Sequence, residues 1–204
     1  MAASETFDYK PRHNIWHFRY REVQNVFLSL CAAEQHWFFL QGHDAYLERL
    51  YLPALSSLLN GIEASLRVTL HLLNKDKEHP DIWALSPYRV LSNKLILQAQ
   101  EAGMPVQYLA FSEEKDFLEN LKSDNRVEIV ELRNDICHGN VTKFINTELG
   151  PEESFFVPDL LRTVTEKVLA ISVDWCQALA HFRKANGFSH YDPPDVPKWA
   201  RRKL

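Results

Sequence analysis

The segment LSSLLNGIEASLRVTLHLL, residues 55–73, decides the fold class of this chain. Its apolar positions recur every three or four residues, the spacing that puts side chains on one face of an α-helix. The members of this stripe are Leu55, Leu58, Leu59, Ile62, Leu66, Thr69, Leu70 and Leu73. A long helix with one apolar face must pack side by side with other helices to bury that face, so the segment predicts a helical bundle.

The helical pattern extends beyond this segment, and we expect it to run from about Asp44 to Asn74. Pro53 lies inside that range. Because proline lacks a backbone donor and crowds the preceding turn, Pro53 should either kink the helix or begin a second piece. A continuous helix would be roughly 45 Å long at about 1.5 Å per residue.

Similar apolar spacing predicts helices on either side of this one. The first is expected from Trp16 to about Gln41, ended by Gly42, and the second from about Pro87 to Ala102, ended by Gly103 and Pro105. A shorter helix should begin after Ser112 as its N-cap and run through Leu121. The last is expected from about Asp159 to Asn186, ended by Gly187. No internal repeat and no strand-like alternation is visible. We therefore expect an all-α fold, a helical bundle of about five main helices with long antiparallel helices.

Composition changes along the chain divide it into three parts. Residues 1–15 read as a polar N-terminal arm, residues 16–187 as the helical bundle, and residues 188–204 as a Pro-rich tail that ends in basic side chains. Inside the bundle, residues 75–87 form a charged stretch that we expect to be a loop.

The bulk composition excludes several classes of protein. The chain has 204 residues, 46% of them hydrophobic, and a formal net charge of -4, so any nucleic-acid binding must use a local patch. We expect no signal peptide and no membrane-spanning segment. Three widely separated cysteines, Cys31, Cys137 and Cys176, are typical of buried free thiols. These features predict a soluble cytoplasmic domain.

The best functional clue is the stretch LRNDICHG, residues 132–139. Val127, Ile129, Val130 and Leu132 precede it at a helical period, and Ser123 or Asp124 is the expected N-cap. Gly139 supplies the left-handed residue that commonly ends a helix. The stretch should therefore form the last turns of one helix.

Three side chains of this stretch are candidates for chemistry. Asn134 and His138 are four residues apart and share a helix face, and the long side chain of Arg133 can swing toward His138. Purely structural roles stay open as well, since a histidine suits a helix C-terminus electrostatically and Arg133 can pair with Glu128 or Glu131. The same R-x-x-x-x-H spacing also occurs from Arg12 to His17, within the polar lead-in.

Context separates the two copies, because only the second follows an apolar helix and is closed by Gly139. There the sequence resembles the HEPN superfamily of helical-bundle proteins, and Arg133, Asn134 and His138 match the signature of that superfamily position by position. The resemblance is specific over about eight residues and architectural elsewhere. It implies a metal-independent endoribonuclease that acts as a homodimer, with RNA as its substrate and with no cofactor.

The resemblance assigns a role to each residue. His138 would accept the proton of a ribose 2′-hydroxyl or protonate the leaving 5′-oxygen, and Arg133 would stabilise the charge on the phosphate. Asn134 would hold the imidazole or a phosphate oxygen. Related proteins suggest a toxin or defence role, with an antitoxin or regulatory protein as a candidate partner.

Several further groups have a weaker functional interpretation. His13 and His17 have metal-compatible spacing but no further ligand nearby. Glu63 and Arg67 are most simply a surface pair, although they can also line the same cleft as Arg133. Asp135 can steer the imidazole or compete for Arg133. The remaining groups are an aromatic set and a basic tail, which can contact RNA but more often serve as core or as solvated charge: Trp16, Phe18, Tyr20, Trp37, Phe38, Phe39, Lys198, Arg201, Arg202 and Lys203.

Two alternatives from other classes stay open. One is a non-catalytic HEPN-like bundle that binds a protein partner or a nucleotide, with the motif serving structure. The other is a helical scaffold unrelated to that superfamily. Net acidity and the lack of an evident basic cleft support the first of these two alternatives.

Overall fold

The computed structural model describes residues 13–73, 90–123, 125–140, 142–146, 150 and 155–194, with side chains from residue 21 onward. Its α-helices are α1 (His13–Leu28), α2 (Ala33–Leu47), α3 (Tyr51–Leu73), α4 (Asn93–Glu101), α5 (Phe117–Asn120), α6 (Glu128–Cys137) and α7 (Arg162–Ala185). Short 3-10 turns occur at Val106–Leu109, Thr142–Phe144 and Pro158–Leu161. The predicted all-α bundle is confirmed.

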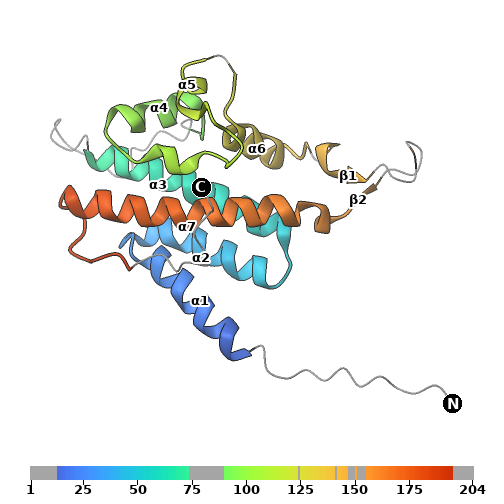
Figure 1. Ribbon diagram of the computed structural model, residues 1–204, viewed down its shortest axis with the longest axis horizontal. Coiled ribbons are helices and arrows are strands. Elements are labelled where there is room, and N and C mark those ends of the chain that lie inside the picture. Colours follow the sequence, from blue (N-terminus) through green and yellow to red (C-terminus); the bar gives the residue numbers. More distant parts are fainter. Residues whose placement is uncertain are drawn as a thin grey trace.

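Helix α3 lies at the centre of the arrangement, beside α7. Figure 1 shows α1 and α2 on one side of α7 and the shorter helices α4, α5 and α6 on the other. The predicted stripe is the core: every member from Leu55 to Leu70 is buried, and Leu73 packs partly against it. Burial of this stripe, at roughly 25 cal/mol per Å² of apolar area, supplies the main driving force for the fold.

The two longest helices run parallel to each other. Hydrogen bonds join α7 to α3: Thr165 Oγ1 donates to the carbonyl of Tyr51 at 3.4 Å, Trp175 Nε1 to Ser65 Oγ at 2.8 Å, and Arg183 Nη1 to Thr69 Oγ1 at 3.2 Å. Residue numbers increase in the same direction along both helices from one bond to the next, so the helices are parallel. The expected antiparallel arrangement occurs between α2 and α3, which are joined by a short turn at residues 48–50. The chain returns from α3 to α7 only after α4, α5 and α6.

The predicted helix from Trp16 to Gln41 is wrong, because the chain contains two helices there. The backbone turns between Leu28 and Ala33, and Cys31 adopts a left-handed conformation with φ of 50°. Gly42, expected as the stop, lies inside α2. A Cβ atom on Gly42 would come within 2.8 Å of Leu58 Cγ, so this glycine lets α2 approach α3 closely.

Pro53 begins a second piece rather than kinking a continuous helix. Helix α3 starts at Tyr51, which puts Pro53 in the first turn, where the missing N–H has no intrahelical partner to lose. Asp44 belongs to the end of α2 instead. The 23 residues of α3 span roughly 35 Å, shorter than a continuous helix from Asp44 would be.

Two further boundaries differ from expectation. Helix α4 begins at Asn93, where Ser92 Oγ accepts the N–H of Leu95 at 3.3 Å, while residues 87–89 lie outside the described residues. The expected end holds, since Gly103 has φ of 79°. The helix predicted from Ser112 is wrong: turns occupy the acidic stretch after it, and only the short α5 follows.

The C-terminal helix agrees with expectation at its closing end. Gly187 has φ of 74° and ends α7, and the next residues turn back along the helix. Lys184 pairs with Asp192, and Gln177 Nε2 donates to the carbonyl of Pro194 at 3.1 Å. Residues 190–194 have no regular secondary structure, and residues 195–204, with the basic tail, lie outside the described residues.

One small element was not expected: residues Ile145–Asn146 (β1) pair with Phe155–Phe156 (β2) in a short antiparallel ladder.

The prediction of buried free thiols is correct for Cys176 and wrong for Cys31 and Cys137, which are free but exposed. Residues 74–89, which include the expected charged loop, lie outside the described residues. No helix in the described part of the chain is both long enough and apolar enough to cross a membrane.

The Trp175–Ser65 hydrogen bond predicts a measurable stability effect. Ser65→Ala leaves the fully buried indole N–H without an acceptor, so the free energy of unfolding should fall by about 1–3 kcal/mol. Ser57→Ala is the control, since Ser57 Oγ donates to the carbonyl of Phe38 in an exposed position on the same helix and should cost about 0.5 kcal/mol or less. Urea denaturation measures both, and equal losses would contradict the role of Ser65.

Candidate active site

Helix α6 ends as the sequence predicts and begins differently. Gly139 has φ of 69°, its N–H donates to the carbonyl of Ile136 at 3.3 Å, and the N–H of Asn140 donates to the carbonyl of Asp135 at 2.8 Å. This pair of bonds is a Schellman motif, which satisfies the last carbonyl groups of the helix. His138 is the C-cap residue.

The N-terminus of α6 corrects the predicted cap at Ser123 or Asp124. The helix starts at Glu128 after Val127, which has extended backbone and whose own side chain makes no capping bond. Glu114 Oε1 accepts the N–H of Glu128 at 3.1 Å instead. Ser123 Oγ instead bonds the carbonyl of Asn120 at 2.9 Å, and Asp124 lies outside the described residues. Asn93 Oδ1 accepts the N–H of Val127 at 3.1 Å, so α4 positions the start of α6.

The inner face of α6 fixes the direction in which its polar residues point. Ile129, Val130, Leu132 and Ile136 are buried in the core. Because successive residues are about 100° apart, Arg133 then lies at the edge of the face that meets α3. The apolar pattern of α6 therefore positions the Arg133 side chain.

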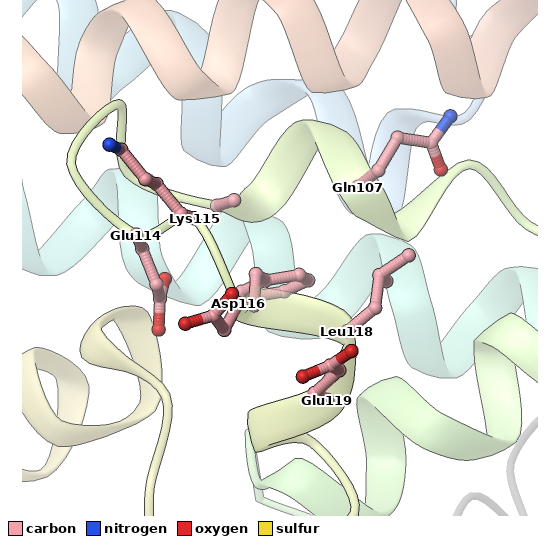
Figure 2. Close-up of a pocket in the computed structure, with 8 residues that line it drawn as sticks. Gln107, Glu114, Lys115, Asp116, Leu118 and Glu119 are labelled. Carbon is pink, nitrogen blue, oxygen red and sulfur yellow. The ribbon is translucent and has the colours of Figure 1, made fainter.

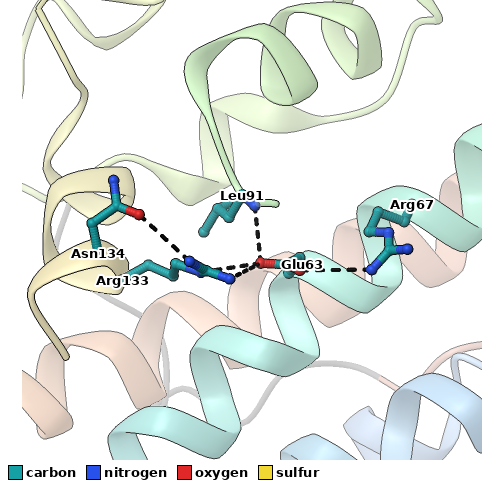
Figure 3. Close-up of polar contacts among 5 residues, drawn as sticks. All are labelled: Glu63, Arg67, Leu91, Arg133 and Asn134. Carbon is teal, nitrogen blue, oxygen red and sulfur yellow. Dashed lines mark hydrogen bonds and ion pairs between the residues drawn. The ribbon is translucent and has the colours of Figure 1, made fainter. Parts of the chain in front are cut away.

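Arg133 contacts a carboxylate on α3. Its Nε and Nη2 atoms both lie 3.1 Å from Glu63 Oε2, and the backbone N–H of Leu91 donates to the same oxygen at 2.9 Å (Figure 3). The Glu63 and Arg133 side chains are only 12% and 13% exposed. A charge-assisted hydrogen bond from Nε, with Nη2 at ion-pair distance from the same oxygen, holds the guanidinium in one orientation.

The simple view of Glu63 and Arg67 as a surface pair is wrong. Glu63 is a buried residue, and Arg67 Nη1 lies 3.7 Å from its Oε1 atom, on the side away from Asn134 (Figure 3). Glu63 and Arg67 do form one polar cluster with Arg133, while the shared cleft of the less favoured expectation stays a prediction. Two guanidinium groups around one carboxylate leave a local formal charge of +1.

The expected approach of Arg133 to His138 does not occur within one chain. Arg133 and His138 are five residues apart, which places them about 140° apart around the helix axis. The His138 side chain is exposed and has no hydrogen-bond partner among the described residues. Asn134 Oδ1 lies 3.5 Å from Arg133 Nη1, at the outer limit for a hydrogen bond. Burial and pairing therefore order Arg133 and leave His138 accessible.

Asp135 neither steers the imidazole nor competes for Arg133. Its Oδ2 atom lies 2.9 Å from Lys143 Nζ, and its Oδ1 atom accepts from Asn140 Nδ2 at 3.0 Å. Lys143 also pairs with Glu131, so the alternative partner considered for Arg133 is engaged elsewhere. The sequence alone did not indicate that Lys143 pairs with residues of α6.

Two surface pockets lie away from these residues. The larger, of about 380 Å³, is lined by Gln107, Ala110, Glu114, Lys115, Asp116, Phe117, Leu118 and Glu119 (Figure 2). Glu114 Oε1 accepts the N–H of Glu128, so this pocket adjoins the beginning of α6, whereas His138 stands at its end. Three carboxylates and one ammonium group make its lining unsuited to phosphate. The smaller pocket, of about 220 Å³, lies between Phe111 and α7.

The weaker candidates receive little support. Within the described residues no group of three or more His, Cys, Asp or Glu side chains is arranged to hold a metal ion. Of the aromatic set, Phe39 is buried in the core, while Trp37 and Phe38 are exposed. The remaining members of that set, the His13 and His17 side chains and Arg12 lie outside the described side chains.

Comparisons with known proteins add no family assignment. No family model matches the chain, and neither the curated proteins nor the solved structures include a match. The functional interpretation therefore rests on the residues of α6 and their surroundings.

The Glu63–Arg133 pair predicts an unequal response to two arginine substitutions. Arg133→Ala leaves a buried carboxylate without its nearest charged partner, so the free energy of unfolding should fall by about 2–4 kcal/mol. Arg67→Ala removes a 3.7 Å contact to Glu63, longer than either Arg133 contact, so the loss of this pair should cost less. Chemical denaturation of both variants tests this, and a larger loss for Arg67→Ala would contradict it.

Proposed function

We propose that this chain is a metal-independent endoribonuclease of the HEPN type that acts as a homodimer. The observation that supports the proposal best is the end of α6, where an exposed imidazole follows a guanidinium that the protein holds in place. An accessible acid–base group and an ordered cation are the two elements that phosphodiester transfer requires. The motif residues Arg133, Asn134 and His138 supply both.

The reaction is an internal transfer at phosphorus. The ribose 2′-oxygen forms a bond to phosphorus while the bond from phosphorus to the 5′-oxygen breaks. One imidazole accepts the 2′-hydroxyl proton, and a proton is donated to the leaving 5′-oxygen. The products are a 2′,3′-cyclic phosphate and a free 5′-hydroxyl, and neither water nor an oxidant is consumed.

Arg133 would stabilise the charge that develops on the phosphate oxygens. Its Nε and Nη2 edge faces Glu63, which leaves donors on Nη1 and the outer side of Nη2 for the phosphate. Asn134, beside Nη1, would contribute an amide to the same phosphate or to the imidazole.

The different directions of Arg133 and His138 support the proposed dimer. One chain directs the arginine toward α3 and the histidine toward solvent, and it supplies a single imidazole for two proton transfers. A twofold axis near the end of α6 would bring two copies of the motif together and supply the second imidazole.

A non-catalytic role is the second candidate, and one observation favours it. Arg133 already has a carboxylate partner, and Glu131 and Asp135 lie on the same helix, so the motif can serve the fold alone. In that case the bundle binds a protein partner, such as an antitoxin or a regulatory protein. Substitution of His138, whose side chain is exposed and makes no hydrogen bond among the described residues, separates the two functions.

RNA cleavage in excess chelator by purified protein tests the proposal. His138→Ala should reduce the cleavage rate by about a hundredfold to ten-thousandfold, the usual contribution of a positioned acid or base. The control is His17→Ala, in the other R-x-x-x-x-H copy, which should retain wild-type activity.

Three outcomes would contradict the proposal. Equal activity in wild type and His138→Ala would indicate a different site or a contaminant. Loss of activity only in His17→Ala would assign the chemistry to the other motif copy. Absence of cleavage by folded wild-type protein across several RNAs would favour the binding module.

A further inference from the structure

We infer that Glu63 is a positioning residue that selects which edge of Arg133 meets the scissile phosphate. The inference rests on the proposed function, because it assigns a role in the same reaction. Glu63 lies on α3, 70 residues before Arg133 in the sequence. It would not touch RNA itself.

Glu63 occupies one edge of the Arg133 guanidinium. A guanidinium has a side edge, formed by Nε and Nη2, and an end edge, formed by Nη1 and Nη2, and either can grip a phosphate. Both side-edge nitrogens lie 3.1 Å from Glu63 Oε2. Only the end edge is left for a phosphate, and it lies on the side where Asn134 Oδ1 approaches Nη1.

The carboxylate is itself held in place, so it can serve as a rigid support. Glu63 is buried on α3, and Leu91 donates its backbone N–H to Oε2 at 2.9 Å. That oxygen therefore accepts N–H groups from Leu91 and from Arg133 Nε, which belong to two separate segments, and Arg133 Nη2 lies at ion-pair distance from it. A flexible arginine would have to be ordered during each turnover, whereas a supported one is ordered before RNA arrives.

The negative charge of Glu63 has a second consequence for the reaction. It offsets part of the attraction between Arg133 and a resting phosphodiester, so it does not tighten ground-state binding. Glu63 favours the reaction by keeping Arg133 aligned with the additional negative charge that the phosphate carries in the transition state. A positioning role therefore predicts a change in kcat without an increase in KM.

Glu63→Gln tests this role by removing the charge while keeping the size and one acceptor. We expect kcat for RNA cleavage to fall about tenfold or more, with KM unchanged or lower. Glu63→Asp, which restores the charge at a shorter reach, should recover part of kcat. Arg67→Ala is the control, since it removes the other ion pair of Glu63 without changing the partner of Arg133.

Arg133→Lys separates positioning from simple stabilisation. Lysine retains a cation that can pair with Glu63 but has no second nitrogen edge for the phosphate. The variant should unfold within a few degrees of wild type and yet lose about a hundredfold or more in kcat. Wild-type kcat in this folded variant would overturn the assignment of the end edge.

The remaining outcomes separate failure of the inference from failure of the proposed function. Cleavage by wild type with kcat unchanged in Glu63→Gln, or with a raised KM alone, overturns the positioning role and leaves the ribonuclease intact. Absence of cleavage by folded wild type overturns the proposed function and this role together.

Discussion

The ion pair between Glu63 and Arg133 is the interaction on which the arrangement of the site depends. It joins α3, at the centre of the bundle, to α6, and the backbone of Leu91 shares the same carboxylate oxygen. Buried ion pairs often add little net stability, because desolvation offsets their attraction, but loss of one partner is costly. The pair therefore acts mainly as a geometric constraint: it fixes the orientation of α6 against α3 and the direction of the Arg133 side chain.

That constraint depends in turn on the packing of α3. Its apolar stripe contacts α2 on one side and α7 on another, and two glycines allow close approach: a Cβ on Gly42 would meet Leu58, and one on Gly61 would lie 2.9 Å from the Phe39 ring. Trp175 and Arg183 of α7 donate hydrogen bonds to Ser65 and Thr69 of α3, and these bonds hold the two helices parallel to each other. With α3 fixed by these contacts, Glu63 projects toward α6 and becomes a support on which a charged side chain can be placed.

Local patterns were sufficient to predict the apolar stripe of α3 and the glycine ends of α4, α6 and α7. The stripe at residues 55–73 and the stops at Gly139 and Gly187 follow from spacing and backbone freedom alone. The break before α2 was missed because the apolar spacing continues through it and Cys31, not glycine, takes the left-handed conformation. Gly42 was misread because a glycine that ends a helix and one that admits a neighbouring helix look alike in sequence. Arg133 and His138 were identified from their motif, but the partner of Arg133 required the tertiary fold, since Glu63 is remote in sequence.

The directions of the Arg133 and His138 side chains also bear on the proposed dimer. Arg133 faces α3 and the His138 side chain is exposed, so under the proposed function a second copy would bring an imidazole and a guanidinium to one phosphate. Sedimentation equilibrium on the purified full chain, over a range of concentrations, measures this most directly. The account predicts a species of about twice the 23.8 kDa chain mass at the concentrations where RNA is cleaved. A strict monomer under those conditions would contradict the composite site.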